Sequence, residues 1–480
     1  MRRQTRDGKA RHVAAVGVVI LVAMVAGGCG DVNRTSCIAR ANEVLRESLR
    51  NDQSDIRALS LEAYRDLNRT APAEELEVII ARDLVPARFE AMLARAEQAR
   101  RTYLRMALLS TMRDRSSEGA GQGEPFRQAE KVLPRAVESR SAVLRTVALD
   151  IQQELQARQQ AVPGTTLATL LSDPRARDNL ASMLAEAEQA RRQDQAYFVA
   201  AMEKESDANV RLAIVYGQAR VGDHRQMRLL AEGLSDIQPS VRRNAAMILG
   251  YLGNRSAVEL LRPRLTDRDA VARLVAAEAV VLLGDTRGLS VIRSLAFGQT
   301  PTEPWIQAAA ILAVGRVGIA SQDVESLRLL EVRTGAVEGA VRLAAFGARG
   351  MLGDYSQMAL LAEGASGRAG FDTQGRALAL QLLARTSYGP AWRDACKGLS
   401  AGDAVVRLSA AWAVLAFNNP RADQVIEAVT RPGLQQWLTE EEILRPYSKP
   451  TATGSPRETM TPTTPPGPLG PMGPLRPLGR

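Results

Sequence analysis

Aromatic residues, cysteine and histidine are all scarce in this chain of 480 residues. Phe, Trp and Tyr together make up 4% of it, and it has three cysteines and two histidines. Beyond the N-terminal segment only His224 remains, in a Gly-Asp-His-Arg turn, so no His/Cys cluster has metal-site spacing. No nucleophile-elbow, phosphate-loop or dinucleotide-binding glycine motif stands at a strand–helix junction. These absences favour a protein that is not an enzyme, and they predict no cofactor, no metal and no small-molecule substrate.

What the chain has instead is a repeated dipeptide. Val-Arg occurs at Val210-Arg211, Val241-Arg242, Val341-Arg342 and Val406-Arg407, with weaker copies at Arg273 and Arg376. Most successive arginines in this series are 31 or 34 residues apart. Self-similarity at a period of about 20–50 residues is typical of a stacked repeat protein rather than of one globular core. Such a protein binds its partners along an extended surface.

Each Val-Arg pair opens a segment with helical periodicity. Val241, Ala245, Leu249 and Leu252 fall on one helical face, and Gly253 supplies the stop signal. The same pattern returns at residues 271–284 and 341–353, and a second amphipathic segment precedes each copy, as at residues 226–234. The sequence therefore predicts an all-α protein with two helices per repeat.

Two helices per 30–35 residues, with an Asp in the turn and Val-Arg opening the second helix, resemble HEAT repeats, in particular the short phycobilisome-lyase type. The resemblance implies a right-handed α-solenoid of stacked antiparallel helix pairs. It also implies a structural ladder of turn aspartates and helix arginines. We assign to this ladder Arg177, Arg211, Asp236, Arg242, Asp267, Arg273, Arg342, Arg376, Asp403 and Arg407. The alternative is that these arginines bind an anionic ligand.

The ladder extends towards the N-terminus with more variation. Ile56-Arg57 and Ala87-Arg88 keep the 31-residue step, and the segment Met92–Arg101 nearly recurs as Met183–Arg192. We predict degenerate repeats over residues 41–200, interrupted by a Gly/Ser-rich loop near 116–124, and regular HEAT repeats over 201–432. Residues 433–445 are expected to form a capping helix, and the Pro/Gly/Thr-rich residues 446–480 a disordered tail.

The N-terminus has the pattern of an export signal. A basic segment precedes an apolar run, Val13 to Ala26, which is shorter than the ~20 residues of a membrane span. Ala26-Gly27-Gly28-Cys29 resembles the lipobox of bacterial lipoproteins, which implies that residues 1–28 are removed and Cys29 is lipidated. Residues 29–40 would be a tether, and the protein would sit on a membrane of the bacterial cell envelope. The alternative is an ordinary signal peptide.

The net charge of +9 is concentrated at the two ends of the chain. Residues 1–28 and 445–480 each carry +4, which leaves +1 for the body between them. The body therefore has no overall basic field, and nucleic-acid binding is disfavoured.

The remaining cysteines predict no disulfide. Cys37 and Cys396 lie near opposite ends of the chain, and an extended solenoid would hold them too far apart to be bridged. Stability should come instead from Ala-, Leu- and Val-rich helix packing.

The function favoured by these patterns is a lipid-anchored scaffold that binds an unidentified cell-envelope protein or peptide on its concave face. The second helices of the repeats should line that face. We expect Tyr216, Arg220, Arg243 and Tyr251 to be exposed there as partner contacts. Two alternatives stay open: a chromophore lyase or other enzyme, by analogy of fold alone, and a passive structural spacer.

Overall fold

A computed structural model describes residues 34–113, 126, 128–139, 141–162, 165–298, 303–321, 324–335, 339–368 and 370–418. These residues form helices and no strands, which confirms the predicted all-α class. No helix within the described ranges combines the length and hydropathy needed to span a membrane. The predictions for Cys29, the signal segment, the 116–124 loop, the capping helix and the tail concern residues outside these ranges.

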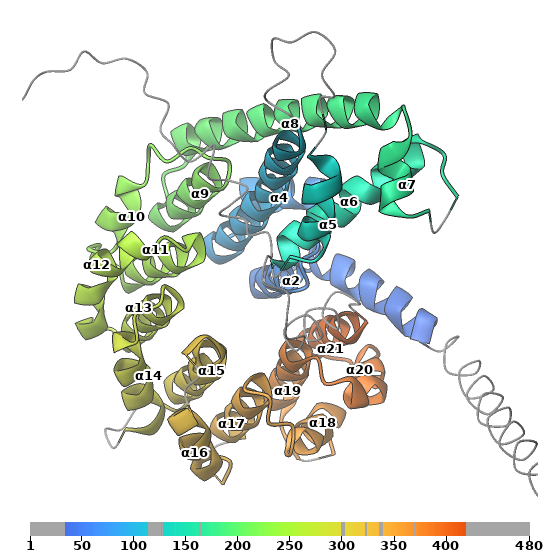
Figure 1. The fold of residues 1–480 in the computed structure, drawn as a ribbon. Helices are drawn as coiled ribbons and strands as arrows, with labels where there is room; N and C mark the ends of the chain where they lie inside the picture. Colours follow the sequence, from blue (N-terminus) through green and yellow to red (C-terminus); the bar gives the residue numbers. More distant parts are fainter. Residues whose placement is uncertain are drawn as a thin grey trace, which may run out of the picture.

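From residue 208 onwards, long and short helices alternate, and the long ones form the inner layer of a curved stack (Figure 1). The inner helices are α9 (Ala208–Arg220), α11 (Pro239–Leu252), α13 (Ala270–Leu282), α15 (Pro304–Ser321), α17 (Gly339–Met351), α19 (Thr373–Thr386) and α21 (Ala404–Phe417). The outer helices are α10 (Arg228–Gly233), α12 (Val258–Leu261), α14 (Arg287–Phe297), α16 (Val324–Arg333), α18 (Met358–Ser366) and α20 (Trp392–Gly398). Each inner helix packs against the next, so this region is the predicted α-solenoid.

Local sequence sets where the inner helices begin and how closely they approach. Asp207, Asp269 and Asp403 each accept a hydrogen bond from a backbone N–H in the first turn of α9, α13 and α21. A Cβ at Gly315 of α15 would lie only 2.8 Å from Ala348 Cα of α17. The small residues therefore allow the backbones of neighbouring repeats to come into direct contact.

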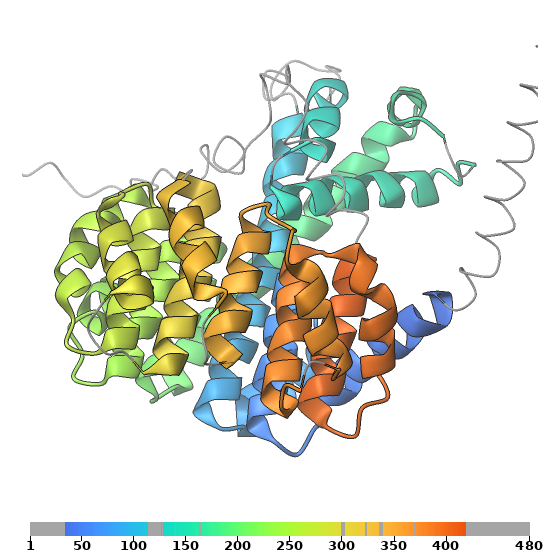
Figure 2. The ribbon, with the colours of Figure 1, turned by 90° about the horizontal axis from the view of Figure 1, so that it is seen from below.

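The N-terminal region is also built from helix pairs, but its helices vary in length. A helix over residues 34–48 is followed by α2 (Ser54–Asp66), α3 (Ala73–Arg82), α4 (Val85–Met112), α5 (Ala129–Val137), α6 (Ala142–Arg158), α7 (Leu167–Ser172) and α8 (Ala176–Lys204). The two near-identical segments, Met92–Arg101 and Met183–Arg192, lie on α4 and α8. These long helices pack against each other, and Arg95 Nη2 lies 2.6 Å from Asp194 Oδ1. Helices α5–α8 project to one side of the stack (Figure 2).

The stack closes into a ring, which the sequence did not predict. Helix α4 packs against α9 and α2, and α2 packs against α21, so both ends of the inner layer meet (Figure 1). Arg385 Nη2 of α19 donates to Glu62 Oε1 of α2 at 2.6 Å, across 323 residues of sequence. Helices α2 and α4 therefore complete the enclosure of the concave face that the inner helices form.

Ring closure also overturns the expectation that Cys37 and Cys396 lie far apart. Both are half-buried against the same hydrophobic core, and Cys37 lies close enough to the Cys396 thiol to raise its pKa. The two cysteines are near each other in space although they are far apart in sequence, because the curved stack closes into a ring.

Candidate functional site

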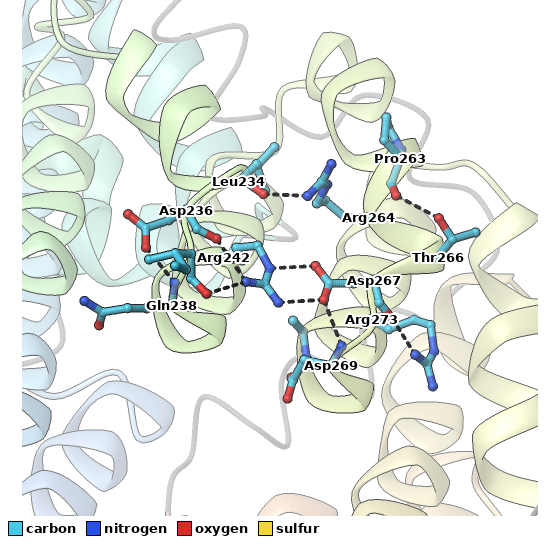
Figure 3. A network of polar contacts seen from close by, with 12 residues as sticks. Leu234, Asp236, Gln238, Arg242, Pro263, Arg264, Thr266, Asp267, Asp269 and Arg273 are labelled. Atoms are coloured by element: carbon cyan, nitrogen blue, oxygen red, sulfur yellow. Dashed lines mark hydrogen bonds and ion pairs between the residues drawn. The ribbon is translucent and has the colours of Figure 1, made fainter. Parts of the chain in front are cut away.

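The ladder arginines share one interaction with the backbone. Nη1 of Arg211, Arg242 and Arg407 donates to the carbonyl oxygen six residues earlier, at 3.0, 2.9 and 2.7 Å respectively. Nη1 of Arg273 donates to Asp267 O in the same way (Figure 3). Arg376 Nε instead reaches Ala365 O at 2.9 Å. These contacts tie the start of an inner helix to the end of the preceding outer helix or to the turn after it, which is a structural role.

The predicted Asp–Arg ladder forms a side-chain pair at one rung of the regular repeats. Arg242 Nε and Nη2 donate to Asp267 Oδ2 and Oδ1 at 2.7 and 2.8 Å, and both side chains are buried (Figure 3). The hydrogen bonds from Arg242 hold the pKa of Asp267 below its usual range, against the effect of burial. The other two predicted aspartates bind backbone instead: Asp236 accepts from Gln238 N at 2.8 Å and Asp403 from Val406 N at 3.0 Å.

Other ladder positions deviate further from the expected pairs. The Arg342 guanidinium lies 5.3 Å from the centre of the Phe371 ring. Arg177 is exposed in the first turn of α8. Upstream, however, Arg57 repeats the full arrangement: Nη1 donates to Asn51 O, six residues earlier, and Nη2 donates to Asp83 Oδ1 at 2.6 Å. The N-terminal region therefore shares the geometry of the ladder although its helices are irregular.

The inner layer of helices surrounds a hollowed interior, which we call the central chamber. One part of it is a cavity of about 580 Å³ whose lining includes Glu62, Arg65 and Asp66 of α2, Tyr251 of α11, Glu278 of α13, Arg316 of α15 and Arg385 of α19. A second cavity of about 430 Å³ shares Arg65, Asp66 and Tyr251 with it and reaches Tyr216 and Arg220. A third, of about 590 Å³, is lined by Glu90 and Arg243. Helices far apart in sequence thus contribute to one interior surface.

Ion pairs join neighbouring helices around the chamber. Arg65 Nη1 lies 2.6 Å from Glu90 Oε2, between α2 and α4. Arg316 Nη2 donates to Glu278 Oε2 at 2.9 Å, between α15 and α13.

The pair at the seam of the ring involves two carboxylates. Besides Glu62, Arg385 contacts Asp66 of α2, with Nε–Oδ2 at 3.4 Å. In the cavity of about 580 Å³ the guanidinium groups of Arg65, Arg316 and Arg385 face the carboxylates of Glu62, Asp66 and Glu278, so its charges balance when all are ionised.

The chamber shifts the titration of its carboxyl groups in both directions. Burial raises the pKa of Asp66 and of Glu90 despite the neighbouring arginines. Burial also acts to raise the pKa of Glu97, but the Arg220 and Arg100 charges and a hydrogen bond from Tyr216 hold it below its usual value. The interior is therefore a partly desolvated environment in which unpaired charge is disfavoured.

The four predicted contact residues divide into two groups. The expectation that Tyr216 is exposed is wrong: it is 2% exposed, and its hydroxyl bonds Glu97 of α4. Arg220 Nη2 donates to Tyr216 Oη at 2.9 Å and to Tyr251 O at 2.7 Å, so Tyr216 and Arg220 help to hold the ring together. Arg243 is exposed and Tyr251 is 42% exposed, and both line the chamber.

A sequence pattern marks the residues that line the chamber. The residues nine positions after Arg57, Arg88, Arg211, Arg242, Arg273, Gln307, Arg342 and Arg376 all line one of the first two cavities: Asp66, Glu97, Arg220, Tyr251, Leu282, Arg316, Met351 and Arg385. The corresponding residues after Arg177 and Arg407, which are Glu186 and Ala416, do not. Nine residues are two and a half helical turns, so this position lies on the opposite side of the helix from the ladder arginine. The two N-terminal members of this set follow Arg57 and Arg88, which places α2 and α4 in register with the regular repeats.

The fold and this repeated register define the class of protein: an α-solenoid of stacked helix pairs, closed on itself. Within it, a family model described as HEAT repeats matches residues 196–281 and 227–296. The chain therefore contains HEAT repeats, as predicted.

Two other proteins are similar to this chain. The chain is 34% identical over 108 residues to the phycocyanobilin lyase subunit alpha of Picosynechococcus sp., a match that covers 21% of this chain. The chain spans 38% of that relative's length. A solved structure of an engineered protein covers 82% of this chain and is itself covered completely, at 14% identity and a TM-score of 0.24.

Among the described residues no group of His, Cys, Asp or Glu has the arrangement of a metal site.

Proposed function

We propose that this protein is a HEAT-repeat scaffold of the bacterial cell envelope, anchored by a lipid on Cys29, that binds a short extended segment of an envelope protein in its central chamber. The observation that carries the proposal is the repeated inward register, because one surface assembled from helices α2 to α19 presents both charges and apolar groups. The cavities, at about 430–590 Å³, fall in the size range of ligand sites, about 300–1,000 Å³. A peptide segment fits such a volume, and a folded domain does not.

Exposed apolar groups support binding at this surface. Tyr251 and Leu282 occupy the same register on α11 and α13 and are 42% and 46% exposed on the chamber wall. The adjacent ion pairs, such as Arg316 with Glu278, offer both donors and acceptors to a peptide backbone. A segment with an apolar residue next to a polar or charged one would match the Tyr251–Leu282 surface and the adjacent ion pairs.

The test is crosslinking in cells from a photoreactive residue placed at position 251. Position 260 is the matched control, because Leu260 is similarly exposed, at 47%, on the outer helix α12. We expect one dominant envelope protein to crosslink from position 251 and not from 260, and to be lost in a Cys29→Ala variant. The same diffuse set of neighbours from both positions would refute a specific scaffold and favour a passive spacer.

A second test uses charge. Arg316→Glu places a carboxylate next to Glu278 and should abolish crosslinking from position 251, whereas Arg228→Glu on the outer face should leave it unchanged. The control is suitable because the Arg228 side chain is 85% exposed. Circular dichroism of both variants would show whether the fold is retained.

A second candidate function is a chromophore-lyase-like activity, which the local similarity to a phycocyanobilin lyase subunit favours. Arg65, Arg316 and Arg385 could then contact acidic groups of a chromophore in the chamber. The measurement is the visible absorption of phycocyanobilin added to the purified protein. A shift in the spectrum that disappears in Arg316→Gln would favour this candidate, and an unchanged spectrum would favour the scaffold.

A further inference from the structure

Two cysteines that are remote in sequence meet at the seam of the ring. Cys37 lies on the helix over residues 34–48, and Cys396 lies on α20 (Trp392–Gly398), 359 residues later. Both side chains are half-buried against one core that includes residues from both ends of the chain, and Cys37 lies close enough to the Cys396 thiol to raise its pKa.

A second contact holds the same two helices together. The Arg34 guanidinium carbon lies 5.1 Å from the centre of the Trp392 ring. Arg34 is one turn before Cys37, and Trp392 is one turn before Cys396. The two helices therefore contact each other over this turn, and the cation–π contact lies next to the two thiols. The thiol contact thus belongs to an interface and is not an isolated approach of two side chains.

We propose that Cys37 and Cys396 form an intramolecular disulfide that locks the ring in its closed form. The Arg34–Trp392 contact, one turn earlier on both helices, and the shared core hold the two thiols near each other, and a disulfide bond of about 2.05 Å would join them. The bond would link the first described helix to one of the last, and would complete covalently the closure that Arg385 makes with Glu62 and Asp66. This inference does not depend on the proposed function.

The reaction needs an oxidant, for which we specify a small-molecule disulfide. One protein thiolate attacks the oxidant and forms a mixed disulfide, releasing one small thiolate. The second protein thiolate then attacks the mixed disulfide at the protein sulfur, so that the protein disulfide forms and the second small thiolate leaves. Two protein thiols are oxidised, the oxidant is reduced to two thiols, and the two protons from the protein end on these products.

The environment of Cys396 indicates the order of these steps. Burial, followed by the interaction with the neighbouring Cys37 side chain, raises the pKa of the Cys396 thiol. Because the thiolate is the nucleophile, Cys396 attacks slowly at neutral pH, and the first attack falls to Cys37. The mixed disulfide at Cys37 then holds its sulfur beside Cys396, where the second step is intramolecular.

The experiment uses the full chain carrying Cys29→Ala, so that only the two cysteines of interest remain. The protein is equilibrated in oxidised or reduced glutathione, quenched in acid, unfolded, alkylated and analysed by mass spectrometry. We expect both thiols to become unreactive together in oxidised glutathione, with a loss of about 2 Da and one linked peptide pair containing Cys37 and Cys396. The oxidised protein should remain monomeric, and its apparent Tm should exceed that of the reduced protein by about 3–5 °C.

Cys37→Ser and Cys396→Ser serve as matched variants. Each should lose the redox-dependent change in Tm, and each should have the Tm of the reduced parent in both buffers. Three results would overturn the proposal: two thiols that remain reactive at equilibrium, a glutathione adduct that persists at Cys37, or a disulfide between two chains on a non-reducing gel. The number of reactive thiols in the parent protein tests the proposed disulfide even where a serine variant fails to fold.

Discussion

The regular repeats after residue 208 and the irregular region before it share the same arrangement of ladder residues, although their helices differ in length. In the regular part the inner helices have 13–18 residues, whereas α4 and α8 have 28 and 29. Both regions nevertheless place an arginine against the carbonyl six residues earlier, as Arg242 and Arg57 do. Both also place the residue nine positions further on in the chamber. Helix length can therefore vary while the register of the ladder is maintained.

Among the substitutions that compare the two regions, we expect the loss of a buried ladder pair to change the free energy of unfolding most. Arg242→Ala leaves Asp267 buried without its partner, and we expect a loss of about 3–5 kcal/mol in the free energy of unfolding. Arg57→Ala removes the equivalent, more exposed pair in the irregular region and should cost about 1–3 kcal/mol. Urea unfolding of both variants is the measurement.

Arg225→Ala is the control for this prediction. Arg225 pairs with Asp223 on the surface and is 77% exposed, so its loss should cost less than about 1 kcal/mol. Equal losses from Arg242→Ala and Arg225→Ala would contradict a structural role for the ladder.

A smaller effect is expected at the seam where the two regions meet. Arg385 binds Glu62 and Asp66 of α2, and its guanidinium lies 5.1 Å from the Trp412 ring centre on α21. We expect Arg385→Ala to cost about 1–2 kcal/mol and to increase hydrogen exchange in α2 and α21 more than in α11 and α13. Uniform exchange across all four helices would argue against a distinct seam. Arg228→Ala, on the outer face, should change neither quantity.

The smallest effects concern pH, and their signs should differ between the two regions. The folded-state pKa of Asp267 is lowered, so its contribution to stability is present above its unfolded pKa of about 3.9 and is lost as pH falls through the folded pKa. Asp267→Asn should therefore destabilise the protein at pH 7, and the difference from the parent should shrink in acid. Urea midpoints between pH 3 and pH 7 measure it.

Glu90 in the chamber should behave in the opposite way. Its folded-state pKa is raised by burial, so ionisation destabilises the fold above the unfolded pKa of about 4.3, and this cost disappears as pH falls below it. Glu90→Gln should be slightly more stable than the parent at pH 7, with the gain shrinking towards pH 4. A destabilised Glu90→Gln at pH 7 would show that the ion pair with Arg65 outweighs desolvation.

The predictive power of the sequence was greatest where the signals were local. Helical periodicity, capping aspartates and the Val-Arg step identified the repeats and the inner helices. The role of the ladder arginines was only partly predicted, because most of them bind backbone carbonyls and a side-chain partner was expected. Of the contact residues, Arg243 and Tyr251 do line the interior, whereas Tyr216 was misjudged because the helix that covers it, α4, is more than a hundred residues earlier in the chain.

The sequence by itself determined the helices, their pairing and the nine-residue offset that selects the inward positions, since each depends on residues within one repeat. Only the tertiary structure decided that the stack closes, that α2 and α4 complete the wall of the chamber, and that Cys37 meets Cys396. The physical reason is that curvature is the sum of small rotations between successive repeats. No local pattern encodes that sum. Contacts such as the one between Arg385 and Glu62, which are 323 residues apart, form only when the ring is closed.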